Sequence, residues 1–149
     1  MASNPPSAVA HMLKKLVAVV AASYLGAGFG LGLYILLRGF GFHFQEIAGD
    51  LSMYFFAGEV FAPIASVFAC VLVSRYVDHV RASKLGILLS LVASYLAIDV
   101  ELRILDAAGT RFLLLWPAIV GCYSFLGYQA GLIVGRRWLS SKHVPKAGG

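Results

Sequence analysis

Charge is what this sequence has least of. Only 13% of its 149 residues are Asp, Glu, Lys or Arg, whereas about a quarter of the residues are charged in an average soluble protein. Apolar residues make up 60% of the chain, and the mean hydropathy is +0.82. A chain of this composition has too little polar surface to cover a water-soluble domain. The composition therefore predicts a protein surrounded by a lipid bilayer.

Residues that build catalytic or metal sites are also scarce. The four histidines lie outside the apolar stretches, so a buried haem or zinc site would lack its usual ligands. The two cysteines, Cys70 and Cys122, would lie ~28 and ~15 Å below the outer boundary, which argues against a disulfide within the chain. No Ser-His-Asp set, paired-cysteine motif or phosphate-binding glycine loop occurs. We therefore expect no enzyme, no catalytic residue, no cofactor and no metal.

Long apolar stretches occupy most of the chain. A hydrocarbon core of ~30 Å is crossed by ~20 helical residues at ~1.5 Å each. Four stretches meet this requirement, and they cover residues 16–37, 51–74, 85–105 and 112–135. The sequence therefore predicts an all-α fold, in which four transmembrane helices form a bundle within a single domain over residues 1–149. The flanking segments 1–12 and 139–149 are expected to be flexible tails.

Basic residues are distributed unequally between the two sides of this predicted bundle. Three lie on one side: Arg38, Arg103 and Arg111. Nine lie on the other: Lys14, Lys15, Arg75, Arg81, Lys84, Arg136, Arg137, Lys142 and Lys146. Because basic flanks stay in the cytoplasm, both termini are predicted to be cytoplasmic in a multi-pass protein of the bacterial inner membrane. The net charge of +5 records this orientation and gives no reason to expect nucleic-acid binding. Aromatic residues, Trp116 among them, are expected to anchor the outer boundary.

Glycines recur at helical spacing in two of the predicted spans. The first span contains Gly26, Gly28, Gly30 and Gly32, and the fourth contains Gly127, Gly131 and Gly135. In lipid, such surfaces let helix backbones approach closely and so hold helices together. One interpretation is packing within a single chain. The other is that one glycine face binds a second copy or another membrane subunit.

A few charged residues fall inside the predicted spans. Glu59 and Asp99 would lie ~12 and ~9 Å deep in the outer half, where a charge costs ~2.5–3.5 kcal/mol near the helix centre. Asp99 and Arg103 are one turn apart and can pair, whereas Glu101 lies on nearly the opposite face. Pro63 removes the hydrogen bond to the carbonyl of Glu59. These five residues are predicted to form an intramembrane polar site, and the alternative is an ion-pair clamp that fixes packing.

The second and fourth spans end in basic–aromatic clusters, Ser74-Arg75-Tyr76 and Gly135-Arg136-Arg137-Trp138. With four spans and cytoplasmic termini, this layout resembles the GtrA-like family, implicated in moving polyprenyl-linked sugars across the bacterial inner membrane. The resemblance and the predicted polar site favour a small transporter or flippase that forms a homo-oligomer. Two alternatives remain: a non-catalytic accessory subunit of a larger membrane complex, and a membrane immunity or regulatory protein that blocks a partner within the bilayer.

Overall fold

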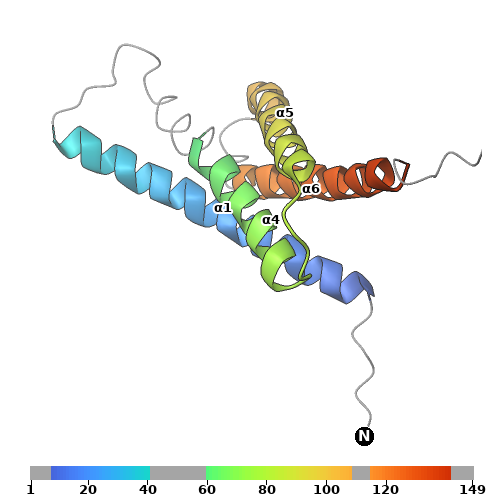
Figure 1. Ribbon diagram of the computed structural model, residues 1–149. Helices are drawn as coiled ribbons and strands as arrows, with labels where there is room; N and C mark the ends of the chain where they lie inside the picture. Colours follow the sequence, from blue (N-terminus) through green and yellow to red (C-terminus); the bar gives the residue numbers. More distant parts are fainter. Residues whose placement is uncertain (1–7, 41–59, 109–114, 142–149) are drawn as a thin grey trace, which may run out of the picture.

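The computed structural model describes residues 8–40, 60–108 and 115–141, with side chains described except over 98–108 and 139–141. All regular secondary structure in these three segments is helical (Figure 1). The helices are α1 (Ala8–Gly39), α4 (Ala62–Tyr76), α5 (Lys84–Ala108) and α6 (Trp116–Ser141). The prediction of an all-α fold is confirmed for this part of the chain.

Two of the helices are long and apolar enough to cross a membrane. They are Ala8–Gly39 and Trp116–Trp138, which correspond to the first and fourth predicted spans. The apolar parts of α4 and α5 with described side chains are shorter, and they cover Ala62–Tyr76 and Lys84–Ala97. Residues 51–59 of the second predicted span lie outside the described part. A bundle of four complete spans is therefore not established by these helices alone.

The helix ends follow local signals. Ser83 precedes α5, and its hydroxyl oxygen accepts a hydrogen bond from the Gly86 amide at 3.3 Å, as an N-cap does. Pro63 and Pro117 lie in the first turns of α4 and α6, where a proline costs no intrahelical hydrogen bond. At the other end of α4, His79 adopts a left-handed backbone with φ of 53°, and the chain turns there into the α4–α5 connection.

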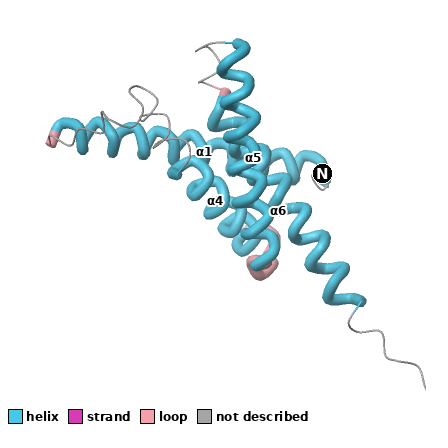
Figure 2. The backbone as a smooth tube through the Cα atoms, turned by 90° about the horizontal axis from the view of Figure 1, so that it is seen from above, coloured by secondary structure: helices cyan, strands magenta, loops and turns pink. Residues whose placement is uncertain are grey.

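The four described helices do not all run parallel to one another (Figures 1 and 2). The most extensive contact is between α5 and α6, and α1 packs against both α4 and α6. In both views the C-terminal half of α1 projects beyond the other described helices (Figures 1 and 2). Three segments are directed toward the same side of the molecule: the first turns of α1, the α4–α5 connection and the end of α6.

Small side chains fill many contacts between the helices, although Phe125, Tyr128 and Trp116 are also buried, and many large apolar side chains face outward. The buried polar side chains of the described residues are all serines: Ser23, Ser66, Ser74, Ser90, Ser94 and Ser124. Large residues such as Leu25, Phe29 and Leu126 are 76%, 62% and 61% exposed. A soluble protein shows the reverse arrangement. This distribution matches helices that are held together by close packing and surrounded by lipid.

Three glycines lie where two helix backbones almost touch. A Cβ on Gly26 of α1 would lie 2.5 Å from the carbonyl oxygen of Phe61 in the turn that begins α4. A Cβ on Gly127 of α6 would lie 2.5 Å from the carbonyl oxygen of Leu89 in α5. One on Gly131 would lie 2.7 Å from the backbone nitrogen of Gly86. None of these positions has room for a side chain.

The other predicted glycines have different surroundings. Gly30 is buried on the same side of α1 as Gly26. Gly28 and Gly32 are exposed, and no atom of the described residues lies within 4 Å of a Cβ placed on either. Gly135 has room for a Cβ, which would lie 3.5 Å from the Ser83 hydroxyl. The two glycine faces of α1 therefore differ, and one of them is uncovered by the described helices.

Candidate functional site

The structure gives unequal information on the five residues of the predicted polar site. Pro63 is buried in the first turn of α4. Glu59 lies outside the described residues. The positions of Asp99, Glu101 and Arg103 belong to helix α5, but their side chains are outside the described part. These three can be placed by the helical register of their neighbours.

The start of α4 is irregular where it approaches the predicted site. Val60 and Phe61 have π-helical conformation, and the α-helix begins at Ala62. Phe61, at the N-cap position, makes no capping hydrogen bond with its side chain. Local π turns occur frequently at functional sites. This turn follows Glu59 directly in the chain.

The buried and exposed faces of α5 are sharply divided. Gly86, Ser90, Ser94 and Ala97 are buried and recur at intervals of three or four residues. Position 101 follows Ala97 by four residues and therefore shares its helical register. Positions 99 and 103 share the register of Leu88, Val92 and Tyr95 instead, and these three described residues are exposed.

The contacts between α5 and α6 fix which positions face each other. Gly131 lies against Gly86, Gly127 against Leu89 and Ala93, and Ser124 against Ser94 and Ser90. Each step of four residues back along α6 therefore corresponds to about four residues forward along α5. The next step brings Val120 to the level of Ala97, and both belong to one buried cluster. Trp116 lies one further step of four residues along α6 and belongs to the same cluster.

Trp116 carries an unpartnered polar group inside this cluster, which consists of Ala62, Ala97, Trp116 and Val120 and is called the Trp116 cluster below. The side chain is 8% exposed, and its Nε1 atom is buried with no hydrogen-bond partner among the described residues. A buried donor without an acceptor costs ~1–3 kcal/mol. The expectation that Trp116 would anchor the lipid boundary is wrong, because the indole packs between helices. Burial and an orphaned N–H identify it as a candidate site residue.

The Trp116 cluster also brings together the chain on both sides of the site. Ala62 is three residues after Glu59 in sequence, and Ala97 is four residues before Glu101. Both alanines are fully buried in the same cluster as the indole. The fold therefore gathers the segments adjoining two predicted acids around one unsatisfied hydrogen-bond donor. An acid and an N–H donor at one place can hold a proton, a cation or the polar group of a substrate.

Three buried serine hydroxyl groups between α5 and α6 are, in contrast, hydrogen-bonded, whereas the buried hydroxyl of Tyr128 on α6 has no partner among the described residues. The Ser94 hydroxyl donates to the Ser90 carbonyl at 2.7 Å, and the Ser90 hydroxyl donates to the Ser124 carbonyl at 2.8 Å. The Ser94 and Ser124 hydroxyl oxygens are 2.5 Å apart. Because the Ser94 proton goes to the Ser90 carbonyl, Ser124 is the donor in this third bond. The three serines form an interhelical clamp.

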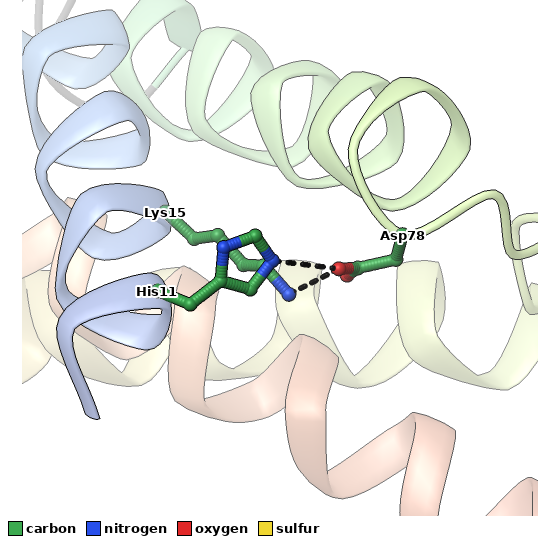
Figure 3. A network of polar contacts seen from close by, with 3 residues as sticks. All are labelled: His11, Lys15 and Asp78. Atoms are coloured by element: carbon green, nitrogen blue, oxygen red, sulfur yellow. Dashed lines mark hydrogen bonds and ion pairs between the residues drawn. The ribbon is translucent and has the colours of Figure 1, made fainter. Parts of the chain in front are cut away.

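A polar contact joins α1 to the α4–α5 connection at the other end of the fold (Figure 3). Lys15 and His11, one turn apart on α1, both face the Asp78 carboxylate. The Lys15 ammonium donates a hydrogen bond to Asp78 Oδ1, and His11 Nε2 lies 3.6 Å from the same oxygen. This contact gives the first turns of α1 a reason to be helical, although the sequence placed residues 1–12 in a tail.

Comparisons with known proteins do not assign the chain to a family. The part of the structure with described side chains contains no group of three or more His, Cys, Asp or Glu residues that could hold a metal ion. Cys70 and Cys122 are free thiols. The similarity in layout to the GtrA-like family stays a prediction. No family model, curated protein or solved structure matches this chain.

Proposed function

We propose that this protein is a four-span transporter or flippase of the bacterial inner membrane, with both termini in the cytoplasm. Its site lies in the outer half of the bilayer between α4, α5 and α6. The observation that carries the proposal is the buried indole N–H of Trp116, which has no partner among the described residues and lies in one cluster with Ala97, four residues before Glu101. Glu59, three residues before the buried Ala62, is the second acid of the site.

The distribution of side chains supports the membrane location. Large apolar residues cover the exposed surface of the described helices, and serines and glycines fill their contacts. Basic residues occur in the segments that are directed toward one side: Lys14 lies in the first turns of α1, Arg75 and Arg81 lie at the end of α4 and in the α4–α5 connection, and Arg136 lies in the last turns of α6. That side is the cytoplasmic one in this proposal.

The chemistry of the site suits a polar group that must leave water. A carboxyl group inside a membrane typically marks a proton or substrate pathway, because it is costly unless it has a function or a partner. The Trp116 N–H can donate to a substrate oxygen, and a carboxylate can accept a hydroxyl proton or attract a cation. The layout that resembles GtrA-like proteins suggests a polyprenyl-linked sugar as the substrate.

Reconstituted vesicles test this proposal directly. A fluorescent polyprenyl-phosphate sugar is placed in both leaflets, and a membrane-impermeant quencher reports how fast the inner copies reach the outside. We expect the wild-type protein to accelerate this exchange and Glu101→Gln and Glu59→Gln each to reduce the rate at least tenfold. Asp78→Asn is the matched control, because it changes an acid far from the site. Wild-type exchange no faster than in empty vesicles, or full exchange by both variants, would overturn the proposal.

The uncovered glycine face of α1 favours the accessory-subunit function as a second candidate. Gly28 and Gly32 have free space on an exposed face that also carries Leu25 and Phe29. A helix of another membrane protein could approach the backbone closely there. In this case Gly28→Leu should release a partner that co-purifies in mild detergent, and Gly39→Leu, also in free space, should retain it. A partner that survives Gly28→Leu would exclude this face.

A further inference from the structure

The charged residues with described side chains are concentrated at one end of the fold. This end consists of the first turns of α1, the α4–α5 connection with the helix ends beside it, and the last turns of α6 (Figures 1 and 2). Asp78 is the only acid among the described side chains. Seven of the eight described Lys and Arg side chains belong to these segments: Lys14, Lys15, Arg75, Arg81, Lys84, Arg136 and Arg137. The eighth, Arg38, lies at the opposite end of α1.

The single described acid at this end is already paired. Asp78 accepts a hydrogen bond from Lys15, and His11 Nε2 lies 3.6 Å from the same carboxylate oxygen (Figure 3). This contact joins the first turns of α1 to the α4–α5 connection, so it keeps the bases of the two segments together. Five exposed bases have no described acid to pair with, and they are called the basic end below: Lys14, Arg75, Arg81, Lys84 and Arg136. Such an excess of positive charge attracts anions.

Exposed apolar and aromatic side chains adjoin the basic end. Tyr76 and Val77, which follow Arg75, are 66% and 47% exposed, and the Arg75 guanidinium carbon lies 5.9 Å from the centre of the Tyr76 ring. Trp138, two residues after Arg136, is 68% exposed. A free phosphate or a nucleic acid would leave these apolar side chains in water. The complementary ligand therefore joins an anionic group directly to hydrocarbon, as an anionic phospholipid does.

We propose that the basic end binds the headgroups of anionic phospholipids in the cytoplasmic leaflet, with Tyr76, Val77 and Trp138 against the headgroup end of the acyl chains. The inference rests on the membrane location in the proposed function, but it requires neither the Trp116 cluster nor transport. An anionic leaflet attracts basic residues close to its surface, and each Lys or Arg there strengthens binding about fivefold. Several exposed bases together therefore select an anionic lipid over a neutral lipid with the same acyl chains.

Lipid retention measures this selectivity. The protein is reconstituted with equal amounts of phosphatidylglycerol and phosphatidylcholine that carry identical acyl chains, extracted in mild detergent, and analysed for bound lipid by native mass spectrometry. We expect the wild-type protein to retain phosphatidylglycerol in preference by about fivefold or more. The triple variant Arg75→Gln, Arg81→Gln, Lys84→Gln should lose most of this preference. Arg38→Gln, which removes an exposed arginine at the opposite end of α1, is the matched control and should keep it. Equal retention of the two lipids by the wild type, or an unchanged preference in the triple variant, would overturn the proposal.

Salt and free phosphate test the same contact in the wild-type protein, without any substitution. Raising the salt concentration from ~0.1 to ~1 M shortens the screening length from ~10 to ~3 Å, so the lipid preference should disappear. Inorganic phosphate in excess over the lipid should leave the preference intact, because it has no hydrocarbon part. A preference that resists salt, or one that free phosphate removes, would overturn the lipid assignment.

Failure of this inference is distinguishable from failure of the proposed function. Loss of selectivity between the two lipids overturns the inference and leaves the membrane location standing. A protein that stays folded in buffer without detergent and retains neither lipid would contradict the membrane location, and the proposed function would fail with it.

Discussion

The closest helix contact in the structure gives the sharpest test of the fold. Gly131 of α6 lies against the backbone of Gly86 and Leu85 in α5. A Cβ on Gly131 would be 2.7 Å from the Gly86 nitrogen and 2.8 Å from the Leu85 carbonyl oxygen. Both are backbone atoms, so no flexible side chain can move aside. Gly131→Ala must therefore separate the two helices.

The size of this separation follows from the contact distances. Ordinary contacts of a Cβ begin at 3.4 Å, so the Gly86 nitrogen must recede by at least 0.7 Å, the difference between 3.4 and 2.7 Å, and the Gly86 Cα, which is closer still, must recede further. A shift of this size at the crossing would also lengthen the 2.8 Å bond from the Ser90 hydroxyl to the Ser124 carbonyl. Overpacking of this kind costs ~1–3 kcal/mol. Alanine restores up to ~1 kcal/mol through its higher helix propensity.

The free energy of unfolding in mixed micelles is the quantity to measure, with Gly28→Ala as the matched control. Position 28 is helical, and no described atom lies within 4 Å of its Cβ. Because both substitutions are glycine to alanine in a helix, the propensity gain cancels and the difference isolates packing. We expect Gly131→Ala to be less stable than Gly28→Ala by ~1–3 kcal/mol. Equal stability of the two variants would refute the close approach of α5 and α6.

Four further predictions concern the polar contacts and the turn. Ser94→Ala should lower the free energy of unfolding by ~0.6–1.7 kcal/mol. If a double-mutant cycle with Ser124→Ala shows no coupling energy, the hydrogen bond between Ser94 and Ser124 is contradicted. Ser94→Cys with Ser124→Cys, in a chain without Cys70 and Cys122, should form an intrachain disulfide on oxidation; Ser94→Cys with Leu126→Cys should not. His79→Gly should raise the thermal midpoint by relieving ~1–2 kcal/mol of left-handed strain, and an unchanged midpoint would count against it. Lys15→Ala should cost no more than ~1 kcal/mol and Lys14→Ala about nothing in chemical unfolding, because the Asp78 pair is partly exposed.

The fold class could be read from the sequence because hydropathy and helix length give the same answer. The runs around α1 and α6 are long and apolar, so they indicate where a helix lies, although the helices cover residues 8–39 and 116–141 and the runs 16–37 and 112–135. For the same reason no amphipathic pattern distinguishes a buried face from an exposed one. Gly26 and Gly28 illustrate the limit: they are two residues apart in one apolar run, but only Gly26 touches a neighbouring helix. Only packing separates them.

The extent of α1 was underestimated for a physical reason that lies far away in sequence. A tail was predicted up to residue 12, because a polar, proline-containing segment precedes the apolar run. The helix begins at Ala8, and its first turns are held by Asp78 in the α4–α5 connection. An ion pair between such distant segments leaves no periodic signal in the sequence.

The candidate site shows a similar limit. The predicted depth of the acids in the bilayer identified them as site candidates. Their helical spacing predicted that Glu101 and Asp99 lie on opposite faces of α5. Which of these faces is buried depends on Ser90, Ser94 and Ala97, and therefore on the packing of α5 against α6. Trp116 was missed because a tryptophan near a predicted boundary is typical of lipid anchoring. Its buried, unpartnered N–H has no counterpart in a sequence pattern.

The contrast between the serine clamp and Trp116 determines how variants of the site should be interpreted. Between α5 and α6, the hydroxyl groups of Ser90, Ser94 and Ser124 donate to one another or to backbone carbonyls, and glycines bring the two backbones together. None of these contacts involves position 101. Glu101→Gln should therefore remove the chemistry of the site while leaving the hairpin folded, whereas Gly131→Ala should weaken the hairpin without altering the site's functional groups. If both variants lose stability equally, the acid is part of the packing, and the transport proposal loses its support.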